Sequence, residues 1–194
     1  MRKKALSAAA ASTAAAALTA LAAVAVAAPA PASAAAVTIK VERAHAEMVR
    51  EWIDPFTCPT NTVLTGRSHY GDENAPTTYY CSFILINGEQ AQVYLSDWTS
   101  RLKESRSDYS APDHQAVAGR WHEGDENGYT RYRTASVYWR GQRVLLANGD
   151  ISGEYRESSH TWQADENKVM TGRLHNGDEN GKTYYRFATV TFAG

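Results

Sequence analysis

Three stretches of this chain repeat one motif: GRSHYGDENAPTTY at 66–79, GRWHEGDENGYTRY at 119–132 and GRLHNGDENGKTYY at 172–185. Successive copies begin 53 residues apart, and nine of the fourteen positions are the same in all three. Self-similarity at a fixed period indicates a protein built from repeated structural units.

The similarity extends upstream of the motif at the same offset. Glutamates recur as Glu51, Glu104 and Glu157. Aromatic residues recur as Phe56, Tyr109 and Trp162. Counting back three units from the end of the chain reaches residue 36, so we predict one domain over 35–194 with repeats at about 36–88, 89–141 and 142–194.

Each repeat has two stretches rich in Thr, Tyr, Val and Phe that flank Gly-Asp-Glu-Asn, at 62–69 and 77–86, 115–122 and 130–139, and 168–175 and 183–192. This composition favours strands, and the short connection predicts a hairpin. A further extended segment precedes each hairpin, at 37–52, 90–102 and 143–155. The pattern predicts an all-β, closed, pseudo-threefold domain, β-prism-like or alternatively β-trefoil-like, because closure hides sheet edges.

The hairpin tips differ between repeats. Asn127-Gly128 and Asn180-Gly181 predict tight type I′ turns, which need positive φ angles at both central residues. The first repeat has Pro76 near the tip, and we expect a wider turn there.

Residues 1–34 have the features of a secretory signal peptide. A basic start at Arg2, Lys3 and Lys4 precedes an apolar stretch, and the segment ends in Ala32-Ser33-Ala34. We expect cleavage after Ala34 and a secreted, extracellular protein. A transmembrane anchor is the alternative, but the stretch is mostly alanine and no stop-transfer charges follow it.

Removing that leader changes the charge balance. The chain has 20 Lys and Arg, of which three lie in the leader, so 17 remain against 21 Asp and Glu, a formal charge of −4. Nucleic acid and anionic membrane are therefore not expected partners, because both need a basic face and no Lys/Arg run occurs.

The two cysteines, Cys58 and Cys81, both lie in the first repeat. An even count in an exported chain predicts a disulfide. A zinc or thiol site is the alternative, but further Cys and His at ligand spacing are missing.

The repeated polar residues form one cluster per hairpin, because Arg and His two residues apart share a strand face. The candidate residues for a binding site or a structural network are Arg67, His69, Asp72, Glu73, Tyr79, Arg120, Trp121, His122, Asp125, Glu126, Tyr132, Arg173, His175, Asp178, Glu179 and Tyr185. In the structural interpretation, each guanidinium is held by the acids of its own turn, which fixes the hairpin. Three equivalent copies favour this interpretation.

The alternative is a shallow sugar-binding site at each hairpin. Carboxylates, amides and guanidinium groups beside aromatic rings suit sugars, whose hydroxyls both donate and accept and whose apolar faces stack on rings. Trp121 lies in the second motif and Tyr70 in the first, but Leu174 takes the matching place in the third. Such sites would therefore be unequal.

Calcium binding and catalysis are weaker alternatives. Calcium loops usually place acids at alternate positions, whereas the motif has adjacent Asp and Glu. His with Asp and Glu suits acid–base chemistry, but no Ser or Cys nucleophile recurs beside them. We expect no catalytic residue, metal or cofactor, and interpret His45, His114 and His160 as surface residues.

Two resemblances follow from these residues. FTCPTNTVLTGRSHYGDEN at 56–74, followed by TTYYCSF at 77–83, resembles the repeat of dermatopontin-like extracellular proteins. This resemblance implies a non-enzymatic matrix or lectin-like binder. The GR-x-H-x-GDENG form and the Ala-rich leader are similar to small exported proteins of actinomycetes, some of which are adaptors in umbrella toxin particles.

The sequence thus predicts a secreted, non-enzymatic binding module with carbohydrate as the favoured ligand. The alternative is a protein–protein adaptor subunit of a secreted multi-subunit, toxin-type particle.

Overall fold

The structure is a computed structural model that describes residues 36–72, 74–125 and 127–193. The predicted signal peptide lies outside the described residues. The described residues form strands and turns, with no helix among them. The prediction of an all-β protein is confirmed.

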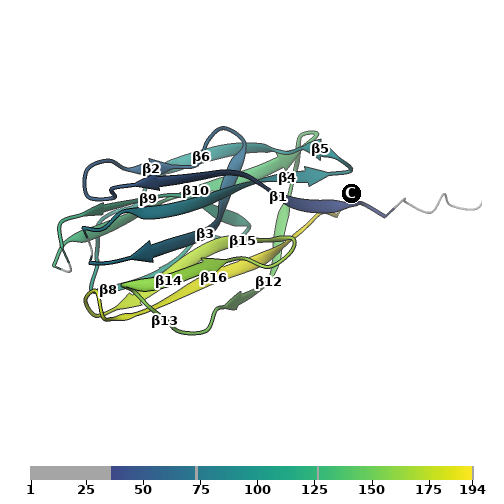
Figure 1. Cartoon of the computed structure of the whole chain (residues 1–194). Helices are drawn as coiled ribbons and strands as arrows, with labels where there is room; N and C mark the ends of the chain where they lie inside the picture. Colours follow the sequence, from purple (N-terminus) through teal and green to yellow (C-terminus); the bar gives the residue numbers. More distant parts are fainter. Residues whose placement is uncertain (1–35, 73, 126, 194) are drawn as a thin grey trace, which may run out of the picture. The chain divides into compact units, whose positions relative to one another are not determined.

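The strands form three sheets, and all their pairings are antiparallel (Figure 1). Sheet A contains β1 (Ile39–Val49), β4 (Thr77–Ile86), β3 (Thr62–Tyr70), β14 (Ser159–Gln163) and β5 (Glu89–Gln90). Sheet B contains β11 (Gln142–Arg143), β10 (Tyr129–Trp139), β9 (Gln115–Glu123), β2 (Phe56–Thr57), β6 (Gln92–Trp98) and β7 (Leu102–Lys103). Sheet C contains β12 (Leu145–Ile151), β16 (Lys182–Thr191), β15 (Lys168–Asn176), β8 (Arg106–Ser110) and β13 (Tyr155–Arg156).

The three hairpins expected around the motif are present as β3–β4, β9–β10 and β15–β16. The preceding extended segments are also strands, since β1, β6 and β12 pair with β4, β10 and β16. Each sheet is thus built mainly from one sequence repeat. The middle strands β3, β9 and β15 each contact the other two, so one face of every hairpin is turned toward the centre.

Three short strands cross from one repeat to the sheet of another. β2 pairs with β9, β8 pairs with β15, and β14 pairs with β3. The last of these crossings returns the third repeat to the first sheet. Sequence reasoning did not predict these strands, although the recurring aromatics Phe56, Tyr109 and Trp162 lie in them.

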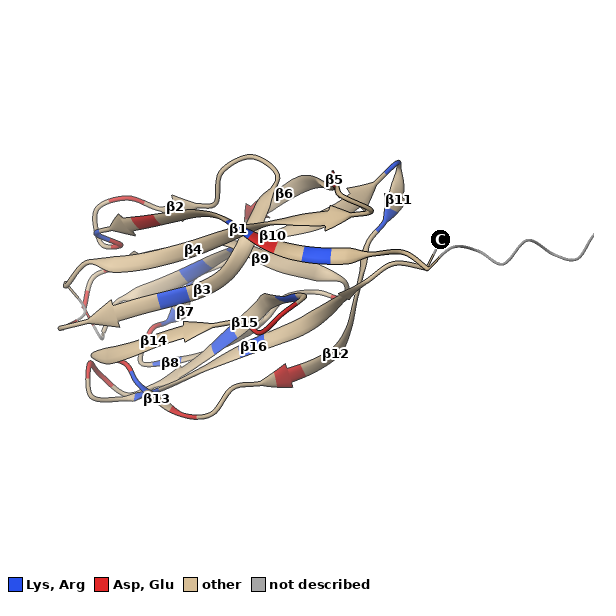
Figure 2. Cartoon of the chain, turned by 45° about the vertical axis from the view of Figure 1, so that its right-hand side comes forward, with Lys and Arg blue, Asp and Glu red and all other residues tan. Residues whose placement is uncertain are grey.

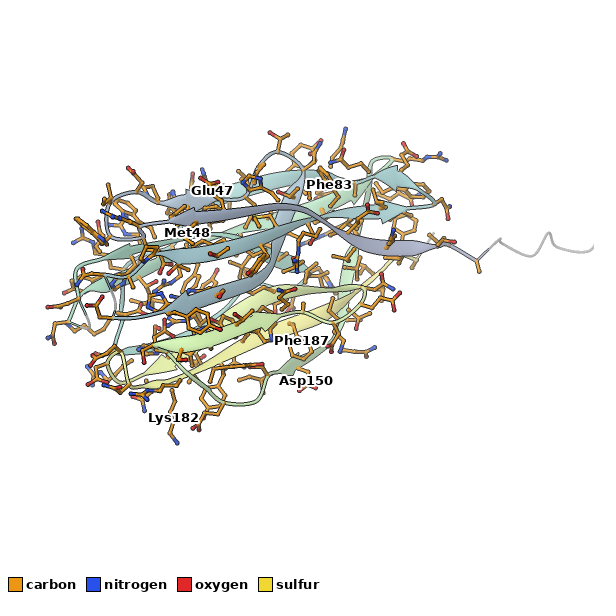
Figure 3. All side chains as sticks on the ribbon, viewed as in Figure 1. Glu47, Met48, Phe83, Asp150, Lys182 and Phe187 are labelled. Carbon is orange, nitrogen blue, oxygen red and sulfur yellow. A yellow bond between two sulfur atoms is a disulfide. The ribbon has the colours of Figure 1, made fainter. Side chains whose placement is uncertain are left out.

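Side chains fill the space between the sheets (Figure 3). One apolar cluster includes Val63, Ala116 and Val169, which are spaced by 53 residues. A second cluster contains the aromatic residues that close each sheet junction. There the crossing-strand rings stack on the motif tyrosines, as Phe56 on Tyr79 (4.4 Å), Tyr109 on Tyr132 (4.3 Å) and Trp162 on Tyr185 (4.4 Å).

The predicted disulfide between Cys58 and Cys81 is confirmed. Cys58 follows β2, and its N–H donates to Ala118 O in sheet B, while Cys81 lies in β4 of sheet A. The bond therefore joins two sheets. The matching places in the other repeats hold Ala111 with Thr134, and Ala164 with Phe187, so those junctions lack this covalent link.

The prediction of type I′ turns at Asn127-Gly128 and Asn180-Gly181 is wrong. The positive φ angles lie instead at the first glycine of each Gly-Asp-Glu-Asn, which has φ of 123° at Gly71, 91° at Gly124 and 113° at Gly177. Gly128 is needed for space, because a Cβ there would collide with Glu123 O. Positive φ at adjacent residues occurs at another hairpin, Asn87-Gly88, which joins β4 and β5.

Candidate functional site

The three motif arginines lie at the centre of the molecule rather than at its surface. Arg67 in β3, Arg120 in β9 and Arg173 in β15 are all at most 3% exposed. Figure 2 shows a cationic (blue) band on β3, and the sequence of this strand contains one Lys or Arg, which is Arg67. Buried guanidinium groups require partners, and these are three glutamates that are also buried: Glu51, Glu104 and Glu157.

These six side chains form a closed ring of ion pairs, which we call the arginine–glutamate ring. The contacts run in the order Arg67 to Glu51 (3.1 Å), Glu51 to Arg120, Arg120 to Glu104 (2.8 Å), Glu104 to Arg173 (2.8 Å), Arg173 to Glu157 (2.9 Å) and Glu157 to Arg67 (2.7 Å). Each glutamate thus joins the arginines of two repeats. The third repeat's Glu157 closes the ring onto the first repeat.

The ring is electrically balanced. Burial by itself would raise the pKa of Glu51, but the neighbouring Arg120 and Arg67 hold that pKa well below its usual range. Burial likewise opposes ionisation of Glu104 and Glu157, but two neighbouring arginines hold the pKa of each well below its usual range. Three cations and three anions therefore neutralise one another in the interior, which leaves these groups little capacity to bind a ligand.

The motif histidines lie two residues after the ring arginines, on the same faces of β3, β9 and β15, and pack beside the ring. His69 Nε2 lies 2.9 Å from Asp72 O, and because a carbonyl only accepts, this nitrogen donates. Its Nδ1 lies 2.8 Å from the Thr77 hydroxyl, which in turn lies 2.9 Å from Glu51 Oε2 and so links the histidine to the ring. Burial, followed by the charge of Arg67, lowers the pKa of His69 to about 4, so the imidazole is neutral at pH 7.

His175 in β15 repeats these contacts, to Thr183 Oγ1 at 2.8 Å and to Gly177 O at 3.0 Å. Burial and Arg173 lower its pKa to about 4 as well. His122 in β9 is equally buried, with Nδ1 3.7 Å from Glu104 Oε2.

The prediction that each arginine is held by the acids of its own turn is wrong. Asp72, Asp125 and Asp178 are exposed, and each carboxylate accepts from the backbone N–H two residues later, at 2.9 to 3.1 Å. These bonds shape the turn and hold the short Asp side chains there. Glu73 and Glu126 lie outside the described residues, and the half-buried Glu179 accepts from the Asn180 side-chain amide.

The remaining predicted residues also divide by burial. Tyr79, Tyr132 and Tyr185 are at most 1% exposed and form the aromatic stacks, whereas Trp121 is half-buried on the outer face of sheet B.

The interpretation of His160 as a surface residue is wrong. Its Nδ1 lies 2.9 Å from Glu157 O, and burial followed by Arg67 lowers its pKa to about 4.

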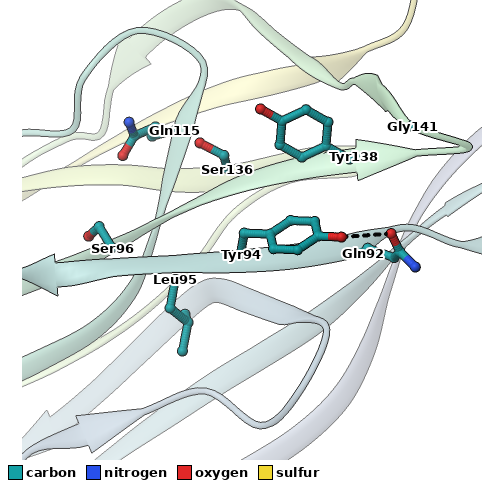
Figure 4. A pocket seen from close by; sticks show the side chains of 8 residues that line it. All are labelled: Gln92, Tyr94, Leu95, Ser96, Gln115, Ser136, Tyr138 and Gly141. Carbon is teal, nitrogen blue, oxygen red and sulfur yellow. Dashed lines mark hydrogen bonds between the residues drawn. The ribbon is translucent and has the colours of Figure 1, made fainter.

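The outer face of sheet B carries an open groove of about 560 Å³. We call it the tyrosine groove, and its polar and aromatic lining is Gln92, Tyr94, Ser96, Gln115, Ser136 and Tyr138 (Figure 4). The Tyr94 and Tyr138 rings meet edge to face with centroids 5.5 Å apart. The Tyr94 hydroxyl donates to Gln92 Oε1 at 3.0 Å, and Tyr94 is 57% exposed.

A second aromatic group lies on the same outer face, and we call it the tryptophan cluster: Trp98, Trp121, Arg131 and Arg133. The two indole rings meet with centroids 6.2 Å apart. The guanidinium of Arg131 lies 4.8 Å from the Trp121 ring, and that of Arg133 lies 5.5 Å from the Trp98 ring. Trp98 lies above Gly119, where a Cβ would come within 3.2 Å of the indole.

Neither feature recurs in the other repeats. At the place of Tyr94 the chain has Val41 and Ala147, and at the place of Tyr138 it has Leu85 and Thr191. The place of Trp121 is taken by Ser68 and Leu174. The outer face of sheet B is therefore distinct, and sequence reasoning missed the groove because its residues lie outside the repeated motif.

Among the described residues, no group of three or more His, Cys, Asp or Glu side chains is arranged to hold a metal ion. That part of the chain also has no helix long and apolar enough to cross a bilayer. Comparison with known protein families, with curated proteins and with solved structures finds no match to this chain.

Proposed function

We propose that this chain is a secreted, non-enzymatic carbohydrate-binding protein whose ligand lies on the outer face of sheet B. The observation that carries the proposal is the tyrosine groove, which combines two tyrosine rings with two glutamine amides and two serine hydroxyls. Sugars need this combination, because their hydroxyls both donate and accept while their apolar faces pack on aromatic rings.

The exposure of the groove supports this location over the hairpin cluster. Tyr94 is more than half exposed, whereas Arg120, His122 and Tyr132 of the neighbouring motif are buried. A ligand can reach the tyrosine groove in the folded protein, whereas access to the buried motif residues requires breaking the arginine–glutamate ring. The cluster therefore has a structural role in this proposal.

A non-enzymatic role is supported by the state of the reactive groups. Cys81 is held in the disulfide, and the motif histidines have their pKa lowered by burial, as at His69 and His175. The tyrosine groove contains amides, hydroxyls and phenols, which suit binding better than proton transfer at neutral pH.

In this proposal the domain is a pseudo-threefold β-prism. The support is that the three crossing strands link the sheets in a cycle, and that the ring and the aromatic stacks recur at the 53-residue spacing. Secretion is supported by the leader-like segment at 1–34 and by the disulfide, which is typical of oxidising compartments.

The test replaces groove tyrosines by the residues of the third repeat, as Tyr94→Ala and Tyr138→Thr. A glycan array with the leaderless chain identifies the best sugar, and calorimetry then measures affinity. We expect each variant to bind about fivefold more weakly or worse, because losing a stacked ring costs on the order of 1 kcal/mol or more.

Tyr70→Ala is the matched control, because Tyr70 is 60% exposed but lies in sheet A. It should bind as the wild type does. Binding lost in Tyr70→Ala and kept in Tyr94→Ala would place the sugar elsewhere, and the absence of any glycan signal would overturn the function.

A protein–protein adaptor is the second candidate, and one apolar patch favours it. Met48, Trp52 and Ile53 are 46 to 70% exposed at the end of β1 and in the turn after it (Figure 3, Met48). The second repeat has Arg101, Ser105 and Arg106 at these places, and the third has Glu154, Ser158 and Ser159. A stoichiometric partner recovered from culture supernatant and lost in Met48→Arg would support this role, including a place in a toxin-type particle.

A further inference from the structure

We propose that the ligand of sheet B is an anionic polysaccharide bearing carboxylates, which extends from the tyrosine groove onto the tryptophan cluster and pairs there with Arg133. This inference rests on the proposed carbohydrate-binding function and adds the ligand's charge and its direction along the sheet.

The two features follow one strand. Tyr138 and Ser136 of the groove, and then Arg133 and Arg131 of the cluster, succeed one another along β10. Arg133 pairs with Trp98 of β6, and Ser136 pairs with Tyr94 of the same strand. At about 3.3 Å per residue, this row from Tyr138 to Arg131 is roughly 23 Å long, which suits a chain of several sugars better than one sugar.

The tryptophan cluster continues the same kind of surface. Trp98 and Trp121 are half-buried, so part of each indole remains open to solvent on the outer face. Exposed flat rings at intervals along a strand are what a linear glycan needs, because successive sugar rings pack on them. The cluster differs from the groove in its charge, since two guanidinium groups replace the amides.

Arg133 is oriented but lacks an acidic partner. Its Nε donates to Ser96 O at 2.8 Å, and within the described residues its two Nη atoms make no hydrogen bond or ion pair. Its counterpart in the third repeat is Arg186, whose Nη2 lies 2.9 Å from Asp108 Oδ1. The same place in the repeat thus holds a neutralised arginine in sheet C and an unpaired one in sheet B.

The crossing strands explain this difference. Asp108 lies in β8, where it pairs with Leu174 of sheet C. Fifty-three residues earlier the chain has Pro55, just before β2, so sheet B receives no carboxylate at that point. The result is a free cation on a chain whose formal charge without residues 1–34 is −4.

A guanidinium with two free Nη donors matches a carboxylate, which accepts two parallel hydrogen bonds. Uronic acids present this group along a polysaccharide. Sulfate esters present a related anion, but the second guanidinium of the cluster, Arg131, already lies 3.9 Å from Glu123 Oε2, and the nearby Arg101 lies 3.1 Å from the same carboxylate oxygen. The structure therefore favours a sparsely charged carboxylate chain over a densely sulfated one.

The test compares an oligogalacturonate with its fully methyl-esterified form, which has the same length and rings but no charge. We expect the acid form to bind the leaderless chain about tenfold more tightly, because a charge-assisted hydrogen bond contributes on the order of 1.5 kcal/mol or more. Arg133→Gln should remove that advantage, so that the acid and esterified forms bind the variant with similar affinity.

Arg186→Gln is the matched control and should keep the tenfold difference, because Asp108 already occupies its guanidinium. Equal affinity for both forms would overturn the inference, as would a preference that survives Arg133→Gln. A sulfated glycan of the same length that binds more tightly would overturn the carboxylate assignment. If neither uronate binds but a neutral glycan still depends on Tyr94, the inference fails and the proposed function stands.

Discussion

The inner and outer faces of the three sheets differ in how closely the repeats agree. On the inner faces the arginine–glutamate ring takes one arginine and one glutamate from every repeat. On the outer faces the repeats diverge, since the place of Trp98 holds His45 and Ile151. The difference indicates that the repeated motif maintains the fold, while the proposed binding surface is made from residues that the repeats do not share.

The geometry of the ring gives a physical reason for its uniformity. Each member contacts two members of opposite charge, so one substitution leaves two buried ions short of a partner. An outer residue such as Trp121 loses only local contacts when it changes. The interior therefore restricts all three repeats to the same residues, whereas each outer face varies independently.

Breaking the ring should have the largest effect on stability. Arg120→Gln leaves Glu51 and Glu104 each with one guanidinium neighbour in a buried site. We expect the free energy of unfolding to fall by about 4 kcal/mol, as found when one partner of a buried ion pair is removed. Chemical denaturation measures this loss.

Arg140→Gln is the control, because Arg140 is exposed and pairs with Glu89 at the surface. It should change stability by less than about 1 kcal/mol. Equal losses in the two variants would mean that the ring contributes no more than a surface pair.

The disulfide makes the first sheet junction different from the other two. Cys58→Ala with Cys81→Thr gives the first repeat the residues of the second, Ala111 and Thr134. We expect a loss of about 3 kcal/mol, because the bond restricts the unfolded chain. Thermal unfolding with and without reductant tests this, and the variant should be insensitive to reductant.

Sequence reasoning predicted the hairpins well because the repeat defines their ends. The expected stretch at 77–86 matches β4, and that at 115–122 matches β9 within one residue. The crossing strands were missed because they are short and pair with another repeat. β2 has two residues and follows Pro55, so it carries no alternating pattern.

The partners of the arginines could not be predicted for the same reason. Glu51, Glu104 and Glu157 recur at the repeat spacing, but Glu51 lies 69 residues before Arg120 in the sequence. Only the closure of the sheets brings such residues together, and local spacing contains no information on closure. The nearby Asp72 was a closer candidate by sequence, yet its carboxylate is bound within its own turn.

Acid should weaken the interior more than the outer face. The pKa of His69, His160 and His175 is lowered to about 4 in the folded chain, whereas an unfolded histidine titrates near 6.5. Between these values the unfolded chain binds more protons, so the free energy of unfolding falls as pH falls from about 6.5 toward 4. Below about 4.5 the ring glutamates add to the loss, because their folded pKa is lower than their unfolded one.

We expect a loss on the order of 3 kcal/mol between pH 7 and pH 5.5, because each of the three histidines contributes about 1 kcal/mol, and urea denaturation at each pH measures it. His45→Gln is the comparison variant, since His45 lies in the edge strand β1 beside Glu47 and outside the ring. Stability that is constant over this range would contradict the neutral, buried state of the three histidines.

The smallest effect is expected at the apolar patch of the first repeat. Met48→Arg with Trp52→Ser and Ile53→Arg installs the residues of the second repeat, which has Arg101, Ser105 and Arg106. These side chains are largely exposed, so we expect the free energy of unfolding to change by less than about 1 kcal/mol. Denaturation with light scattering at high concentration measures stability and self-association together.

The triple variant also distinguishes two explanations for these exposed apolar side chains, which are contact with a partner protein and packing within the chain itself. If the patch serves a partner, its removal leaves the fold intact and improves solubility, because exposed apolar area is what the variant loses. If stability instead falls by more than about 2 kcal/mol, the patch packs on the turn that carries Glu51 toward the ring. In that case Met48, Trp52 and Ile53 would contribute to the stability of the fold as the inner-face residues do. The contrast between inner residues that maintain the fold and outer residues that vary freely would then not hold for this segment.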